Sequence, residues 1–519
     1  MGRSWKSIWL FLSVWLVTRI AFFYWFGSRL IFDEASYLYE IKSLSENSIH
    51  VFSQGPVLYY WVLPFFKLAH SILISKLPIL LADLVFLGVI YFALKKHDEK
   101  IASCTALLYA LAPISLFVSY HLTTEVLALM FTFLSIFFFV RFHAYRSVKD
   151  LIGAGIFLLL GGLTKEMDFF LYLFFPIYLI LWHWKVEKVH KKVVYALVGL
   201  IVITFIVKVG ILTGLSWGKN PTRLSSMFFL PFKNGGFLNG GVLYFVMVFF
   251  LFVNPITAIL GYPKVYSFLK SLFKKKVKVK RGDLLLRLRF ISATVVAFLV
   301  LFFTYFGANE ARYVYFVVPF VALLAAQRFS SLSMKWKVGL VILALASQVW
   351  LVVEYEKDSE GFDVLGVYLD ALPTDTIYTD NPHRSSEHFV PSILSFKTSK
   401  KVVYLDEADL VSLAKKQPIY LLAYHRSGLK SVDDLLSENR IEFDRVTFVV
   451  GDYNRYIYVV GAKLPRMEKI AYQTFFTQPL RTPPEEWLFQ YLIYAKRDFC
   501  SVPKEMRGWF RAHVCSWGE

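Results

Sequence analysis

Two adjacent carboxylates, Asp33 and Glu34, follow the first long apolar run of the chain, in the stretch IFDEASYLYE (31–40). Carboxylates can act as general bases or hold a metal ion, and Lys and Arg can bind a phosphate and stabilise it as a leaving group. Other acids and bases stand at the ends of later apolar runs, namely Glu125, Lys165, Glu166, Asp168, Glu310 and Arg312. A base, a cation clamp and apolar surroundings together predict the transfer of a group from a lipid phosphate to an acceptor.

The elements that must position these side chains are membrane-spanning helices. The chain of 519 residues is 56% hydrophobic and 18% aromatic, whereas soluble proteins are about 45–50% apolar. Apolar runs of roughly 20 residues recur, long enough to cross a bilayer core. The run 8–26 is too long for a signal peptide and lacks a cleavage site, so we interpret it as a retained span. About eleven spans are expected, near 8–27, 71–94, 101–119, 123–142, 150–164, 169–184, 193–213, 241–261, 290–306, 313–330 and 338–353.

The net charge of +19 is concentrated in loops between the apolar runs, at 95–100, 141–149, 185–192 and 274–283. Such clusters mark cytoplasmic loops and contact anionic lipid, which argues against a nucleic-acid partner. With the N-terminus in the cytoplasm, every basic loop falls inside and the acid-bearing segments fall outside. The pattern predicts a multi-pass protein of the cell membrane whose candidate site and C-terminal region are extracytoplasmic.

Two outer loops are long. The loop 28–70 contains aromatic, amphipathic stretches, which favour helices lying in the membrane interface. The segment 214–240 is rich in Gly, Pro and Asn and is interpreted as a mobile loop or lid.

The composition changes near residue 355, which predicts a membrane domain at 1–354 and a C-terminal domain at 355–519. Stretches at 375–382, 400–407 and 417–425 read as short strands, with helix-like segments between them. This alternation predicts a small α/β domain with a largely parallel sheet, closed by a hairpin at 444–464. Cys104 is expected in the core, and a disulfide between Cys500 and Cys515 is left open.

Several motifs resemble, in order, those of the GT-C glycosyltransferases, in the branch of the protein O-mannosyltransferases and aminoarabinose (lipid A) transferases. The stretch FDEASYLYE resembles the acidic motif of their first outer loop. The others are GPVLYYWVLPFF (55–66), KLPILLADLVFLGVIYFAL (76–94), SYHLTTEVLALMFTFL (119–134), GGLTKEMDFFLYLFFP (161–176) and NEARYVYFVVPF (309–320). The likeness covers roughly residues 5–330 and implies a polytopic α-helical membrane protein of the GT-C type.

The resemblance implies a role for individual residues. Asp33 would be the catalytic base or orient the acceptor, with Glu34 shaping the site. Glu125 would support Asp33 or contact the sugar, and Lys165 and Arg312 would contact the donor phosphate. The implied donor is a polyprenyl (dolichyl-type) monophosphate sugar, and the implied chemistry is direct displacement with inversion at the anomeric carbon.

The chain also departs from the family pattern. Where the aminoarabinose branch has a Glu-Lys pair before two prolines, this chain has Gln54-Gly55 and the single Pro56, so the phosphate clamp would use Lys165, Arg312 or Arg223. The protein O-mannosyltransferases carry a β-trefoil domain in an outer loop, and no such insertion fits this sequence, which argues against carrying over a protein Ser/Thr acceptor. The acceptor stays open between lipid, glycan and protein. Candidates for acceptor or sugar contact are Gln54, Tyr59, Tyr60, Glu166 and Glu310, although the tyrosines also suit interface anchors and Glu310 could simply pair with Arg312.

Other functions fit parts of the sequence. A transporter would also carry ionisable residues, but near mid-membrane and with internal repeats, which we do not find. An oligosaccharyltransferase-like or polymerase enzyme of the same fold class and a non-catalytic surface protein are further alternatives. The sequence makes no cofactor certain and leaves the need for a metal open: two acids could hold Mg²⁺ or Mn²⁺, whereas sugar monophosphate donors often need no metal. Asp83, inside the second span, could be a buried structural acid or part of a donor groove.

Overall fold

The computed structural model describes the chain in ranges separated by gaps. The described residues are 2–30, 32–46, 55–165, 168–186, 188–214, 249–271, 283–306, 311–356, 362–379, 394, 396–424, 432–450 and 455–462. They divide into two compact units. The first takes in Met1–Gly27 and Leu44–Val352, and the second takes in Ser28–Ser43 and the described residues after Val352.

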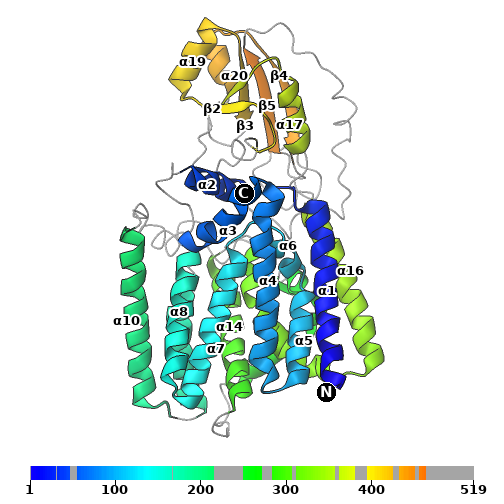
Figure 1. Cartoon of the computed structure of the whole chain (residues 1–519), viewed down its shortest axis with the longest axis vertical. Helices are drawn as coiled ribbons and strands as arrows, with labels where there is room; N and C mark the ends of the chain where they lie inside the picture. Colours follow the sequence, from blue (N-terminus) through cyan, green and yellow to red (C-terminus); the bar gives the residue numbers. More distant parts are fainter. Residues whose placement is uncertain are drawn as a thin grey trace. The chain divides into compact units, whose positions relative to one another are not determined.

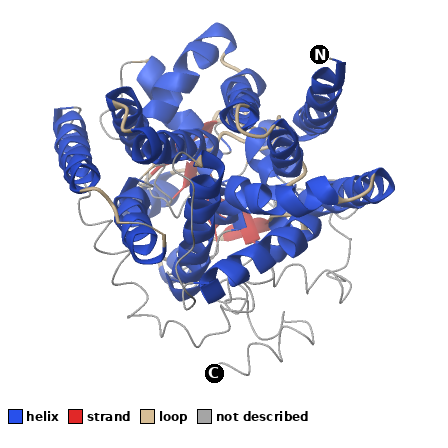
Figure 2. Ribbon diagram, turned by 90° about the horizontal axis from the view of Figure 1, so that it is seen from below, coloured by secondary structure: helices blue, strands red, loops and turns tan. Residues whose placement is uncertain are grey.

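The first unit is a bundle of α-helices, several of which are seen end-on in Figure 2. In chain order its helices are α1 (Gly2–Phe26), α3 (Pro56–Ala69), α4 (Ile72–Lys95), α5 (Glu99–Ala110), α6 (Pro113–Ser119), α7 (Glu125–Tyr145), α8 (Val148–Thr164), α9 (Asp168–Lys185), α10 (Lys191–Gly214), α13 (Pro255–Ser271), α14 (Leu284–Phe306), the 3₁₀-helix η2 (Ala311–Val317), α15 (Val318–Ser331) and α16 (Met334–Glu356) (Figure 1).

Six stretches of the described chain are long and apolar enough to cross a membrane. They lie in α1, α4, α7, α10, η2 with α15, and α16, and the bent pair α5–α6 makes a seventh if it is one span. The helices α8, α9 and α14 stand at three of the other predicted places, and α13 (Pro255–Ser271) overlaps only the last part of the predicted span 241–261. That these helices also cross the membrane stays a prediction. A multi-pass helical membrane protein is therefore confirmed, while the number of spans is not.

Two of the predicted spans are not continuous helices. The predicted span 101–119 bends by 68° between α5 and α6, at Pro113. Proline fits the first turn of a helix but cannot continue one, so α6 starts anew at this residue. In the described part of the predicted span 241–261, Asn254 has a left-handed backbone (φ 87°) and α13 begins just after it.

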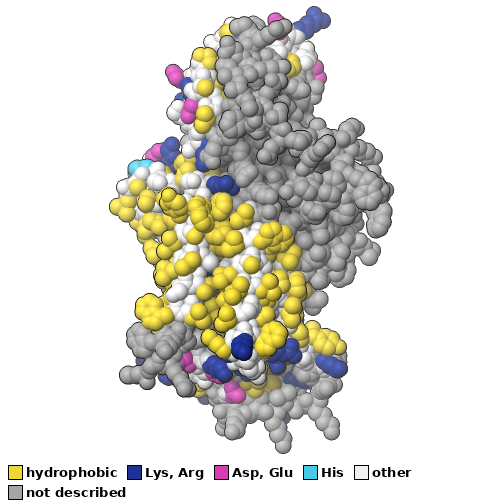
Figure 3. All heavy atoms as spheres, turned by 90° about the vertical axis from the view of Figure 1, so that its right-hand side faces the viewer, with side chains coloured by type: hydrophobic (Ala, Val, Ile, Leu, Met, Phe, Trp, Pro, Cys, Tyr) yellow, Lys and Arg dark blue, Asp and Glu magenta, His cyan; other side chains and the backbone are white. Residues whose placement is uncertain are grey.

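The outer surface of the bundle suits contact with lipid. A broad apolar band covers the face drawn in Figure 3, with charged side chains gathered below it. Exposed apolar side chains on α1 and α16 include Trp9, Val17, Ile342 and Trp350. The spans of α7 and of η2 with α15 are 83% buried, whereas α1, α10 and α16 are mostly exposed. One of the two most buried spans, α7, begins with the candidate residue Glu125.

The second unit contains α2 (Phe32–Ser45), α17 (Phe362–Ala371), α19 (Glu407–Lys416), α20 (Val432–Glu438) and a five-stranded sheet. Its strands are β1 (Thr376–Thr379), β2 (Lys401–Tyr404), β3 (Ile419–Tyr424), β4 (Phe443–Val450) and β5 (Arg455–Ala462), in the order β2-β1-β3-β5-β4. The strand β1 runs parallel to β2 and β3, while β5 is antiparallel to β3 and β4. The predicted strands and hairpin are present, but the sheet is mixed rather than largely parallel.

Apolar side chains of α19, α20 and the sheet form the core of the strand-containing part, with Leu410, Leu421 and Leu436 fully buried. The Asp406 side chain caps α19 by accepting a hydrogen bond from the backbone N–H of Asp409 at 2.8 Å. The division into domains at 354 and 355 and the extracytoplasmic location stay predictions. Cys500 and Cys515 lie outside the described residues.

Candidate active site

The helical hairpin of α7 and α8 brings two of the predicted site residues together. Glu125 is the first residue of α7, and Lys165 directly follows α8. The Lys165 Nζ lies 2.5 Å from the Glu125 Oε1, and only 14% of the lysine side chain and 1% of the glutamate side chain are exposed. The start of α7 and the end of α8, distant in sequence, therefore form one charged site.

The hairpin forms because a short turn joins two apolar helices. Arg146, with a left-handed backbone (φ 61°), ends α7, and α8 starts two residues later. The Ser135 hydroxyl donates to the carbonyl of Ala154 at 2.9 Å, which ties the helices together along their length. Glu125 also occupies a favourable place by itself, since a carboxylate in the first turn complements the helix dipole.

Helix α3 packs against the same end of α8. Pro56 occupies its first turn, and Gly55 precedes it with an extended backbone. A Cβ added to Gly55 would overlap the carbonyl of Leu163, next to the lysine-bearing end of α8. On α3, Tyr59 is fully buried and Tyr60 is 51% exposed, so these two candidate sugar contacts lie in different environments.

The first-loop acids lie on α2, in the second unit. Asp33 is the second residue of this helix, and the Glu34 side chain is fully buried. The helices predicted within the stretch 28–70 are present as α2 and α3, and that they lie in the membrane interface stays a prediction. That Asp33 and Glu34 face the Glu125–Lys165 pair stays a prediction.

Only some of the remaining predicted site residues lie within the described ranges. The backbone of Arg312 lies in η2, directly before α15. Four candidates fall outside the described residues: Gln54, Glu166, Arg223 and Glu310. Their proposed contacts with phosphate, sugar or acceptor stay predictions.

A buried polar cluster, which sequence reasoning identified only through Asp83, lies in mid-bundle. The Arg19 Nε is 3.4 Å from the Asp83 Oδ2, and both side chains are fully buried. The indole N–H of Trp15 donates to the same carboxylate oxygen at 2.6 Å. Sequence reasoning missed Arg19. Its charge inside an apolar run was an available signal, because ionisable residues within spans usually pair in the bundle interior.

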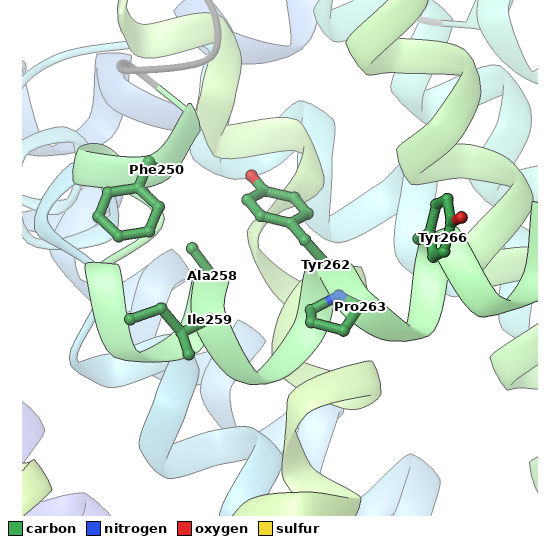
Figure 4. Close-up of a pocket in the computed structure, with 6 residues that line it drawn as sticks. All are labelled: Phe250, Ala258, Ile259, Tyr262, Pro263 and Tyr266. Carbon is green, nitrogen blue, oxygen red and sulfur yellow. The ribbon is translucent and has the colours of Figure 1, made fainter.

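An apolar hollow of about 530 Å³ lies beside α13 (Figure 4). Aromatic and aliphatic side chains line it, namely Phe250, Ala258, Ile259, Tyr262, Pro263 and Tyr266. It shares no residue with the Glu125–Lys165 pair, and its lining suits an acyl or prenyl chain rather than a charged group.

Within the described ranges, no three His, Cys, Asp or Glu side chains gather in a way that could hold a metal ion. One partner of the Glu125 carboxylate is the Lys165 ammonium, a cation that competes with a metal for the same oxygen. An ammonium group has three N–H donors, so a lysine held by a carboxylate can also contact a phosphate. The pair as described suits binding of an anion.

The chain is similar to a family of mannosyltransferases in sequence and to a solved membrane protein in fold. A model of the family described as "Dolichyl-phosphate-mannose-protein mannosyltransferase" matches residues 53–211, a range that contains Glu125 and Lys165. Among solved structures, ArnT from Cupriavidus metallidurans bound to undecaprenyl phosphate aligns with a TM-score of 0.57, covering 88% of this chain and 98% of that chain. The chain has the fold of ArnT.

The two sequences are 14% identical, so the likeness to ArnT concerns the fold. The apo state of ArnT from the same organism aligns over the same shares of the chains, with a TM-score of 0.50 and 15% identity. The curated proteins contain no match to this chain. The resemblance to GT-C glycosyltransferases inferred from the motifs is confirmed by the family match and by the fold of ArnT.

Proposed function

We propose that this chain is an integral-membrane glycosyltransferase that moves a sugar from a polyprenyl monophosphate donor to an acceptor on the outer face of the membrane. One observation carries the proposal: the region that matches the mannosyltransferase family contains Glu125 and Lys165, which the fold brings to 2.5 Å. The fold shared with ArnT, whose crystal structure contains undecaprenyl phosphate, supports a polyprenyl phosphate as the donor lipid.

In the proposed reaction, the acceptor oxygen or nitrogen attacks the anomeric carbon of the sugar. The bond from that carbon to the phosphate oxygen breaks, and the polyprenyl phosphate leaves with the electron pair. Asp33 takes the proton of the acceptor as its general base. Because the attack comes from the side opposite the phosphate, the configuration at the anomeric carbon inverts.

Cations stabilise the phosphate as negative charge develops on it. Lys165 is the best placed candidate among the described residues, because Glu125 holds its ammonium and an ammonium group carries three N–H donors. Arg312 and Arg223 are proposed to complete the clamp, since Arg can bind phosphate with two parallel hydrogen bonds. Glu34 is proposed to shape the acceptor side of the site.

A transfer assay tests this function. The full-length protein in lipid nanodiscs receives undecaprenyl or dolichyl phosphate carrying labelled mannose or aminoarabinose, with lipid, glycan or peptide acceptors. The expected result is stoichiometric release of polyprenyl phosphate and an acceptor that carries the sugar with inverted configuration. Folded protein that neither binds a polyprenyl phosphate nor releases one from any of these donors would contradict the proposal. Repeating the assay with EDTA tests whether Mg²⁺ or Mn²⁺ is needed.

A further inference from the structure

The break between α5 and α6 exposes backbone carbonyls that a continuous helix would satisfy. Side chains from other helices bind them instead. The Arg19 Nη1 of α1 donates to the carbonyl of Ala110 at 2.6 Å, and the Gln348 Nε2 of α16 donates to the same carbonyl at 2.9 Å. Unsatisfied carbonyls are costly inside a membrane, so these bonds stabilise the broken conformation.

The next carbonyl is satisfied in the same way, because the Asn254 side-chain amide donates to the carbonyl of Leu111 at 3.1 Å. Gln348 also reaches the carbonyl of Ala112 at 3.2 Å, which accepts in addition from the backbone N–H of Leu116 at 3.1 Å. All of these donors are buried. Side chains from three separate parts of the bundle therefore hold one helix break.

Arg19 connects this break to Asp83 and to α6. Its Nε faces the Asp83 carboxylate at 3.4 Å, and its Nη2 donates to the Ser115 hydroxyl of α6 at 2.8 Å. After α6, the chain runs through fully buried residues to Glu125 at the start of α7. One arm of the cluster, from Arg19 through Ser115 and α6, thus leads to the start of α7, where Glu125 pairs with Lys165.

A second arm runs to η2. The Tyr109 hydroxyl donates to the Asp83 Oδ1, and it lies 2.6 Å from the Tyr315 hydroxyl. The Tyr315 hydroxyl also reaches the same carboxylate oxygen at 3.5 Å. Tyr315 is fully buried and belongs to η2, the short helix whose backbone includes Arg312. The cluster thus contacts η2, which contains the proposed donor contact Arg312, and α6, from which the chain leads to Glu125, a partner of the proposed donor contact Lys165.

We propose that Arg19, Asp83 and Tyr315 are positioning residues of the donor site, which fix the starts of α7 and η2 relative to each other. The inference builds on the proposed function. Stability alone does not account for the cluster, because a buried ion pair contributes little net stability compared with apolar residues of similar size. We attribute the cluster to fixed geometry instead. If the cations that bind the phosphate are misplaced, donor binding and transfer weaken even though every contacting group is still present.

The test removes one hydroxyl from the cluster. Tyr315→Phe keeps the ring and detaches η2 from Asp83, and Tyr178→Phe is the matched control, because it removes a buried hydroxyl that bonds to His143 at 2.8 Å. We expect Tyr315→Phe to weaken undecaprenyl phosphate binding and raise the donor KM by roughly threefold to tenfold, the usual effect of losing one buried hydrogen bond. Tyr178→Phe should leave both unchanged at a similar melting temperature.

A second pair of variants tests the arm of the cluster that runs to α6. It also keeps the inference testable if Tyr315→Phe does not fold. Ser115→Ala removes the α6 hydroxyl that accepts from Arg19, while Ser330→Ala removes a buried hydroxyl that donates to the carbonyl of Gln327 within α15, at the end of that helix away from η2. Ser115→Ala should raise the donor KM, and Ser330→Ala should not.

Unchanged donor affinity in the folded Tyr315→Phe and Ser115→Ala variants would overturn the inference. Equal losses in these variants and in their controls would also overturn it, because they would reflect a general effect on the fold. A wild-type protein that neither binds the lipid phosphate nor transfers a sugar would instead refute the proposed function.

Discussion

Replacing Lys165 by methionine should destabilise the protein much more than replacing Glu125 by glutamine. Methionine fills the space of the lysine stem but leaves a carboxylate that is 1% exposed without this cation. Removing one partner of a buried ion pair costs about 3–5 kcal/mol, and because 14% of the Lys165 side chain reaches solvent, we expect about 3 kcal/mol. Glutamine keeps an oxygen that accepts from Lys165, so Glu125→Gln should cost about 1 kcal/mol.

Thermal unfolding of the full-length protein in detergent, at one fixed scan rate, measures these losses. At about 2 °C per kcal/mol, the melting temperature should fall by about 6 °C for Lys165→Met and about 2 °C for Glu125→Gln. The double variant should lose less than the sum of the single losses, by about 1–2 kcal/mol, because it no longer contains a buried carboxylate that lacks the Lys165 ammonium. Lys335→Met, at an exposed lysine of α16, is the control and should have little effect. Additive losses, or equal shifts for the two single variants, would refute the reasoning.

Two further predictions concern backbone packing and pH. Gly55→Ala should separate α3 from α8 and lower the melting temperature, since its Cβ would overlap the Leu163 carbonyl. Gly88→Ala is the control, because a Cβ at Gly88 meets nothing within 4 Å. A melting temperature for Gly55→Ala no lower than that for Gly88→Ala would contradict this prediction. The hydrogen bond from the Thr398 hydroxyl is the main cause that lowers the pKa of the exposed Asp370 carboxyl. The ionised Asp370 carboxylate therefore stabilises the fold at pH values above its unfolded pKa of about 3.9. This contribution is lost as the pH falls through the lower pKa that the carboxyl has in the folded protein. Asp370→Asn should flatten the decline of melting temperature below about pH 4, and an unchanged decline would count against this contribution.

The sequence allowed the membrane class to be predicted, because apolar length is a local signal. Glu125 and Lys165 were both named as candidates because charged residues at the ends of apolar runs are also a local signal. That they pair with each other appears only in the fold, and their roles in a site stay predictions. The break at Pro113 was missed, although the proline was visible, because a run of apolar residues reads the same whether the helix is straight or bent. The partners of the freed carbonyls, such as Arg19, come from distant helices and no local pattern indicates them.

The sheet shows a similar limit. The strands β1, β2 and β3 were readable from short runs of β-branched and aromatic residues. The antiparallel placement of β5 beside β3 was not readable, because the alternation of side chains along a strand does not state its direction or its neighbour. The tyrosines of α3 show the same problem for the site, since Tyr59 is buried and its neighbour Tyr60 is 51% exposed.

The central claim is that Asp33 is the base of a sugar transfer from a lipid phosphate, and its most direct test is the initial rate of transfer from a labelled undecaprenyl-phosphate sugar. General base catalysis contributes about 10²–10⁴-fold, so Asp33→Asn should lower the rate by at least about 100-fold while donor binding and the melting temperature stay as in the wild type. Asp150→Asn, which removes a carboxylate paired with Arg141 at the opposite end of the α7–α8 hairpin, should keep the rate. A rate for Asp33→Asn within about threefold of the wild type would contradict the claim.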